Sequence, residues 1–198
     1  KVWQQEYERG KTLYPVKETG NTDKTGTLVT FRPDLSIFKD VDKYNYETLA
    51  NRMRELSFLN KGINISLTDK RKKVDGEFKS ESFHSEHGLK EFISFLDENR
   101  EPLIPEVISI EGEKNNVPVE IAMVYNSSFN ENIHSYVNNI NTHEGGTHLS
   151  GFRRGLTSTL KKYADSSGLL DKIKFEISGD DFREGLTAII SVKVAEPQ

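Results

Sequence analysis

The sequence predicts an α+β fold in which helices pack on a mixed β-sheet. Three segments space their apolar residues three and four positions apart, which is typical of amphipathic helices. Shorter segments alternate apolar and polar residues, as half-buried strands do. The chain has 198 residues, of which 34% are apolar and 10% aromatic. A chain of this size can bury a core without disulfides, and its apolar periodicity argues against disorder.

The clearest helix signal follows Asn45, a suitable N-cap, and continues to about Lys61, where Gly62 offers a C-terminal stop. Its apolar face consists of Tyr46, Leu49, Ala50, Met53, Leu56 and Leu59. A second helix is predicted over residues 88–99 and a third over residues 147–163.

Strand-type patterns occupy most of the remaining chain. They cover residues 2–7, 28–31, 63–67, 78–83, 107–111, 117–125, 133–140 and 186–194. Residues 13–17 are predicted to return beside the first strand, across a turn at 8–11. Residues 70–76 are interpreted as a charged hairpin loop, and 115–116 as a polar turn. Residues 173–177 fit either a strand or an irregular approach to the polar stretch that follows.

The composition excludes several classes of protein. The absence of cysteine rules out a disulfide scaffold, a thiol nucleophile, a cysteine zinc site and an iron–sulfur cluster. The net charge is −4, so a nucleic-acid contact would need a local basic face. No signal peptide and no apolar run of about 20 residues is seen, which favours a cytoplasmic setting. A chain that starts with lysine inside a strand pattern is expected to be part of a longer protein.

No self-contained catalytic machinery is visible in the sequence. The histidines are His84, His87, His134, His143 and His148. A metal site built on His143, His148 and Glu144 does not match an established ligand spacing, so local hydrogen bonding is the preferred interpretation. Asp180 and Asp181 follow a glycine, which favours a turn or N-cap role over an acid pair. Neither a nucleophile elbow nor a phosphate-binding glycine loop is present.

Two segments carry candidate binding residues. Thr25-Gly26-Thr27 could bring backbone and a hydroxyl close to a ligand, although such a turn is more often simple strand punctuation. From residue 145 to 164 the chain has four basic residues and no acid: Arg153, Arg154, Lys161 and Lys162. Spacings of seven and eight allow a basic stripe that could meet phosphates, against the alternative of a solvated helix face. A second basic run, residues 70–73, is interpreted as a solvated hairpin tip.

Four motifs resemble those of one known family, in the same order along the chain. They are DKTGT at 23–27, RMRELSFLNKG at 52–62, YVNNINTHEGGTH at 136–148 and ISGDDFREGLTAIISVKV at 177–194. The sequence resembles the ATPase subunits of bacterial type IIA topoisomerases, DNA gyrase B most closely and topoisomerase IV next. One departure is His87, where this family commonly has a glycine.

The resemblance implies a division of the chain. Residues 1–33 would be the last strands of a gyrase-type ATPase domain, and 34–198 a transducer domain with a left-handed βαβ crossover. The implied nucleotide-binding residues are Gly26, Thr27 and Val29. Arg153 matches a basic position facing the DNA cavity of the dimer, and Arg154 and Lys161 of the basic stripe join it as DNA-facing candidates. No catalytic residue is expected here, because the family's general base precedes Lys1 and its phosphate-contacting lysine motif would follow Gln198.

The resemblance also implies function and partners. The parent would be an ATP-dependent type II DNA topoisomerase that couples ATP binding and hydrolysis to strand passage and negative supercoiling. ATP and Mg²⁺ would be its cofactors, with none expected on this stretch alone, and the stretch alone would not hydrolyse ATP. Its partners would be the gyrase A subunit, a second copy of the gyrase B chain and double-stranded DNA, and no membrane. The alternatives are a topoisomerase IV ATPase chain or a non-enzymatic nucleic-acid-binding module.

Overall fold

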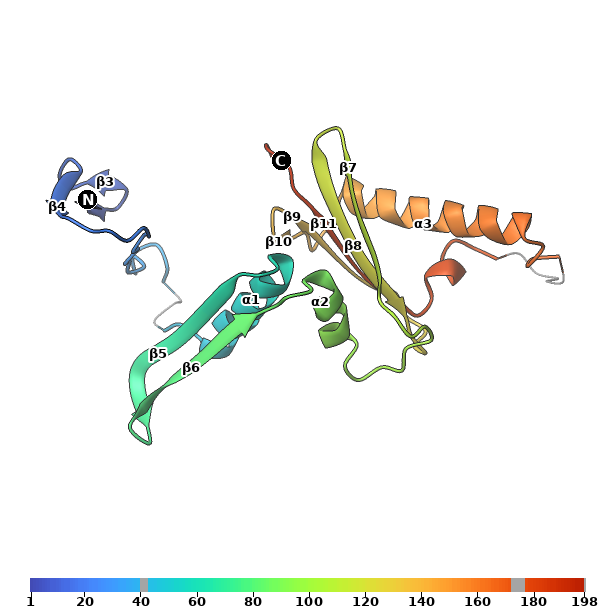
Figure 1. Cartoon of the computed structure of the whole chain (residues 1–198), viewed down its shortest axis with the longest axis horizontal. Coiled ribbons are helices and arrows are strands. Elements are labelled where there is room, and N and C mark those ends of the chain that lie inside the picture. The colour runs from blue at the N-terminus through green and yellow to red at the C-terminus, as the bar shows by residue number, and fades with distance from the viewer. Residues whose placement is uncertain (40–42, 172–176, 198) are drawn as a thin grey trace. The chain divides into compact units, whose positions relative to one another are not determined.

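The computed structural model describes residues 1–39, 43–171 and 177–197. The chain forms two compact units, Lys1–Asn45 and Tyr46–Gln198 (Figure 1). The functional boundary at 33/34 is a separate matter and stays a prediction.

The first unit consists of two small antiparallel pairs. β1 (Val2–Gln4) pairs with β4 (Lys17–Gly20), and β2 (Tyr7–Glu8) pairs with β3 (Lys11–Thr12). The turn between β2 and β3 uses positive φ at Arg9 and Gly10, which confirms the predicted turn at 8–11. The predicted strand over residues 2–7 is divided into β1 and β2, which have different partners. The return strand was misplaced by the sequence pattern, because it covers 17–20 instead of 13–17.

The predicted strand at residues 28–31 is wrong. These residues have no regular secondary structure, and Leu28, Val29 and Phe31 are 91%, 74% and 72% exposed. A strand needs a neighbour to satisfy its backbone groups. Within the described part of the first unit, no strand lies beside this segment to provide one.

The second unit is built on a five-stranded mixed sheet with strand order β10-β9-β11-β8-β7. Its strands are β7 (Ile108–Lys114), β8 (Val117–Tyr125), β9 (Asn132–Val137), β10 (Ile140–Asn141) and β11 (Leu186–Val192). The β9–β11 pair is parallel and the other pairs are antiparallel. The turn joining β7 and β8 is the predicted Asn115–Asn116 pair, with φ of 53° and 60°. The α+β prediction is therefore confirmed.

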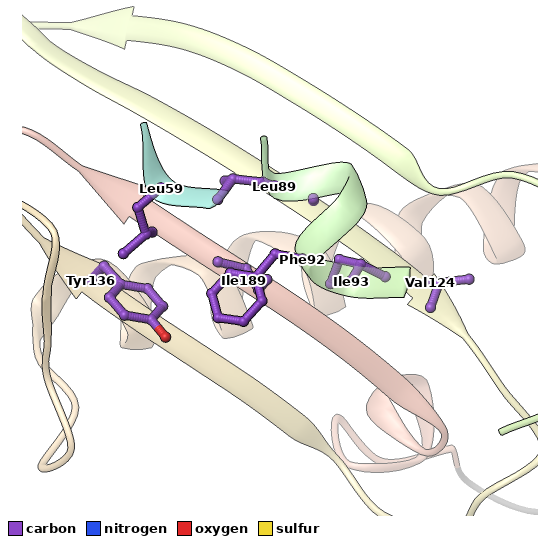
Figure 2. Close-up of a cluster of buried hydrophobic side chains, with 8 residues drawn as sticks. Leu59, Leu89, Phe92, Ile93, Val124, Tyr136 and Ile189 are labelled. Atoms are coloured by element: carbon purple, nitrogen blue, oxygen red, sulfur yellow. The ribbon is translucent and has the colours of Figure 1, made fainter. Parts of the chain in front are cut away.

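Helices cover both faces of this sheet. On one face α2 (Leu89–Leu96) packs with Leu59, the last residue of α1 (Tyr46–Leu59), against Tyr136 and Ile189. Figure 2 shows this cluster, with Phe92 and Ile93 of α2 beside Ile189. On the other face α3 (Thr147–Ser166) supplies Leu149 to a cluster with Ile190 and Val192.

The central strand β11 is buried on both faces. Thr187 and Ser191 carry hydroxyl groups on one face of this strand, yet they are only 0% and 3% exposed. Alternate residues of a strand point to opposite sides of a sheet. Because helices cover both sides, the hydroxyl-bearing face lies in the interior.

A long hairpin extends the second unit. β5 (Asn64–Val74) pairs with β6 (Glu77–His84), and α1 packs against this hairpin, with Tyr46 and Ala50 of the helix in one buried cluster with Phe83 of β6. The predicted loop at 70–76 is too long, because β5 runs on to Val74 with an irregular register between Asp69 and Lys73. Only Asp75 and Gly76 form the turn, both at positive φ.

The predicted strand 133–140 is interrupted by a tight turn. Asn138 and Asn139 have φ of 49° and 65°, a conformation that asparagine tolerates well, and Ile140 begins the returning strand β10. Beyond this turn α3 connects β9 to its parallel neighbour β11, which makes a βαβ crossover. Its handedness stays a prediction. The prediction for 173–177 falls almost wholly outside the described residues.

Candidate nucleic-acid interface

The start of α3 depends on the two glycines before it. Gly145 has φ of 83°, and a Cβ on Gly146 would lie 2.8 Å from the ring of His148. That ring places Nε2 3.2 Å from Oγ1 of Thr142, whose hydroxyl also donates to the carbonyl oxygen of Ser135 on β9. Burial lowers the pKa of His148, which favours the neutral ring. The Gly-Gly-Thr-His segment therefore anchors α3 to the sheet, and its histidine, His148, bonds locally as predicted.

The solvent side of α3 carries the basic side chains. Arg154, Lys161 and Lys162 are exposed, whereas Leu149 and Ala164 of the same helix are buried. A separation of seven residues places Arg154 and Lys161 two turns apart, about 10 Å along one face. Neither forms an ion pair with any residue in the described ranges, so both are available to an anionic partner.

Arg153 differs from its neighbours because it is ion-paired. Its Nε lies 2.7 Å from Oε1 of Glu131, and its Nη2 contacts the same oxygen. Glu131 stands in the loop between β8 and β9. The Arg153 side chain keeps 42% of its surface exposed. Of Arg153, Arg154 and Lys161, only Arg153 forms an ion pair with a residue that the structure describes.

The acidic pair near residue 180 has a structural role. Asp181 accepts the backbone N–H of Ser178 at 2.7 Å, and this hydrogen bond lowers the pKa of Asp181. Asp180 pairs with Arg183 in the short 3₁₀ helix η1 (Asp181–Arg183). The two carboxylates bind different partners, so the turn interpretation is confirmed.

Metal binding and membrane insertion find no support in the described ranges. Among residues 1–39, 43–171 and 177–197, no three histidine or carboxylate side chains lie together as ion ligands would. No helix in the same ranges is long and apolar enough to cross a bilayer.

The implied nucleotide-binding residues lie together in one irregular stretch of the first unit. Gly26, Thr27 and Val29 are all exposed, and a Cβ added at Gly26 would meet nothing within 4 Å. The role of these three residues stays a prediction.

The second basic run is solvent-exposed, as predicted. Residues 70–73 belong to the end of β5, however, and not to the turn itself. Arg71 donates from Nε and Nη2 to both carboxylate oxygens of Asp69, and these bonds lower the pKa of Asp69 to about 2. A local acid therefore offsets part of this positive charge.

Sequence reasoning missed Glu131 and Arg183. Arg183 lies inside the 177–194 motif, and this membership was a usable signal. Glu131 has no motif and is 22 residues from Arg153, so only the folded chain brings the two together.

Comparison with known families decides the relationship. A family model described as DNA gyrase B matches residues 88–198, more than half of the chain. The chain belongs to the DNA gyrase B family. The family-level resemblance found in the motifs is thereby confirmed.

Curated relatives agree over the whole chain. The DNA gyrase B protein of Cytophaga hutchinsonii is 62% identical over 200 residues, and that of Clostridium acetobutylicum is 50% identical over 198 residues. Both alignments cover 100% of this chain but only 41% and 30% of the relatives. The chain thus spans less than half the length of these gyrase B relatives.

Solved structures show the same fold. The 43K ATPase domain of Thermus thermophilus gyrase B, solved with an aminocoumarin, is 32% identical with a TM-score of 0.79, covering 99% of this chain and 52% of its own. A Francisella tularensis topoisomerase IV ATP-binding domain has a TM-score of 0.74 at 24% identity, covering 100% of this chain and 52% of its own. At that identity the second match supports the fold alone.

Proposed function

We propose that this chain is part of the gyrase B component of DNA gyrase, an ATP-dependent type II topoisomerase that drives strand passage and negative supercoiling. The observation that carries this proposal is the agreement over the whole chain with a solved gyrase B ATPase domain. The gyrase B family match and the gyrase B names of the relatives support it.

In this proposal residues 1–33 complete an ATPase domain and residues 34–198 form the transducer, with a left-handed crossover through α3. Gly26, Thr27 and Val29 would lie near the base of ATP, where backbone and hydroxyl groups can hydrogen-bond to a base edge. Open space at Gly26 and the exposure of Thr27 are compatible with that contact. No described cluster of carboxylates would hold Mg²⁺, so no step is assigned to the ion here.

The transducer would present α3 to duplex DNA. Arg153, Arg154 and Lys161 would contact phosphates, which gives affinity without base specificity and makes binding depend on salt. ATP binding would favour one arrangement of the two domains over another, and a second gyrase B chain would close the clamp. The gyrase A subunit would provide the DNA gate that this motion controls.

The test is a supercoiling assay with the full-length gyrase B protein and its gyrase A partner. Relaxed closed circular plasmid, incubated with ATP and Mg²⁺, should become negatively supercoiled, and the same mixture without ATP should not. Efficient decatenation of linked circles without supercoiling would instead favour the topoisomerase IV alternative. If the protein shows neither activity but still retains nucleic acid in a filter-binding assay, a non-enzymatic binding module is favoured.

A further inference from the structure

Glu131 binds two arginines at once. Its Oε1 accepts from Arg153 on α3, with Nε at 2.7 Å, and its Oε2 accepts from Nε of Arg183 at 2.6 Å. The carboxylate side chain is 23% exposed, between a more open Arg153 at 42% and a more buried Arg183 at 14%. Each oxygen therefore has its own guanidinium partner.

Arg183 is the fixed end of this chain of contacts. Its Nη1 donates to Oγ1 of Thr157 on α3 and to the carbonyl oxygen of Gly179, both at 2.8 Å. Its Nη2 pairs with Asp180. A guanidinium held by this many partners in a rigid fork has little freedom to move, so it holds Glu131 in one orientation.

Arg153 keeps part of its guanidinium open to solvent. Glu131 is shared with Arg183, and Asp180 also pairs with Arg183, so the two arginines and the two carboxylates together carry no net charge. Arg153 uses Nε and Nη2 for Glu131, and its Nη1 makes no hydrogen bond to any residue that the structure describes. One nitrogen of an oriented guanidinium, with two N–H donors, is thus left for an acceptor outside the chain.

We propose that Glu131 is a positioning residue for Arg153, which holds the guanidinium ready for a phosphate of duplex DNA. The inference rests on the proposed DNA-facing role of α3. It leads to an unusual expectation, because removing an acid beside a DNA-binding surface would ordinarily strengthen binding. Here removal of the Glu131 charge weakens it, since a freely rotating Arg153 must be ordered again on every contact.

The experiment measures DNA-stimulated ATP hydrolysis by the full-length gyrase B protein with gyrase A, over a range of duplex DNA concentrations and salt. Glu131→Gln should raise the half-stimulating DNA concentration about threefold or more. Arg153→Ala should raise it too, and should also reduce by about one the slope of log DNA affinity against log salt concentration. Asp180→Asn is the matched control, because it removes an acid from the same cluster, keeps a side-chain oxygen that can accept from Arg183, and leaves the contact between Glu131 and Arg153 in place. It should leave the half-stimulating DNA concentration unchanged or slightly lower. Glu131→Asp, which keeps the charge, should recover part of the loss.

The decisive comparison is the double variant. If Glu131 acts through Arg153, Glu131→Gln has no further effect in an Arg153→Ala background. The inference is overturned if Glu131→Gln leaves the half-stimulating DNA concentration unchanged or lowers it, as Asp180→Asn does. It is also overturned if the effect of Glu131→Gln persists in the Arg153→Ala background. If Arg153→Ala leaves the DNA stimulation of ATP hydrolysis unchanged and the variant still supercoils DNA, the inference is overturned and the gyrase proposal remains intact. Thermal unfolding of each variant excludes a loss of fold.

Discussion

The hydroxyl of Thr187 on β11 is predicted to stabilise the sheet despite lying in its core. Thr187 is 0% exposed and donates to Oδ1 of Asp97 at 2.7 Å. It also accepts from Arg100 and Asn126, each at 3.1 Å. Thr187→Val keeps the shape and replaces the hydroxyl by a methyl group. If apolar burial alone mattered, the substitution would be neutral or stabilising.

The hydrogen bonds of Thr187 make the valine substitution destabilising instead. A hydrogen bond to a charged group contributes about 1.5–3 kcal/mol, and the Asp97 side chain, only 10% exposed, would lose one. Taking about 2 kcal/mol, and tenfold per 1.4 kcal/mol, the amides of β11 should exchange with solvent about 30-fold faster. Native-state hydrogen exchange on the full-length protein measures this directly.

Thr187→Ser provides the control, because it keeps the hydroxyl and loses one methyl group. It should cost about 1 kcal/mol and accelerate exchange less than the valine variant does. Exchange in Thr187→Val that is equal to or slower than in the wild type would refute the reasoning, since the hydroxyl would then contribute nothing.

The other predictions concern four further positions or pairs. Gly185→Ala should destabilise the second unit by about 2 kcal/mol or more, because φ is +71° and the new Cβ would lie 2.4 Å from a main-chain oxygen; an unchanged melting temperature would contradict this. Thr27→Val in the full-length protein should weaken nucleotide binding, and equal affinity by calorimetry would make the residue structural only. Arg154→Ala combined with Lys161→Ala should lower the salt slope of DNA binding by about two, and an unchanged slope would remove these side chains from the DNA path. Burial depresses the pKa of His148, so the stability it contributes is present above about pH 6.5 and is lost as the pH falls through its lower folded value; His148→Gln should therefore flatten the decline of melting temperature below that pH.

Local pattern predicted most elements of the second unit. The α1 signal after Asn45 and the β7–β8 hairpin with its Asn115–Asn116 turn needed only periodicity and turn chemistry. The segment 28–31 shows the limit of that reasoning, because its apolar residues predict a strand whether or not a partner strand is there. The Asn138–Asn139 turn was hidden for a similar reason, since the residues on either side of it continue a strand pattern.

The amino-acid sequence by itself determined the α+β class, the family and the basic character of α3. Each of these follows from the composition, spacing and motifs of residues that are close together in the sequence. Tertiary structure alone decided which of the basic residues are paired. Glu131 and Arg183 are separated by 52 residues, yet each contributes to one ion-pair cluster with α3. Burial of both faces of β11 likewise depends on what packs against it. Contacts between distant segments are set by how the sheet and helices assemble, and no local period carries that information.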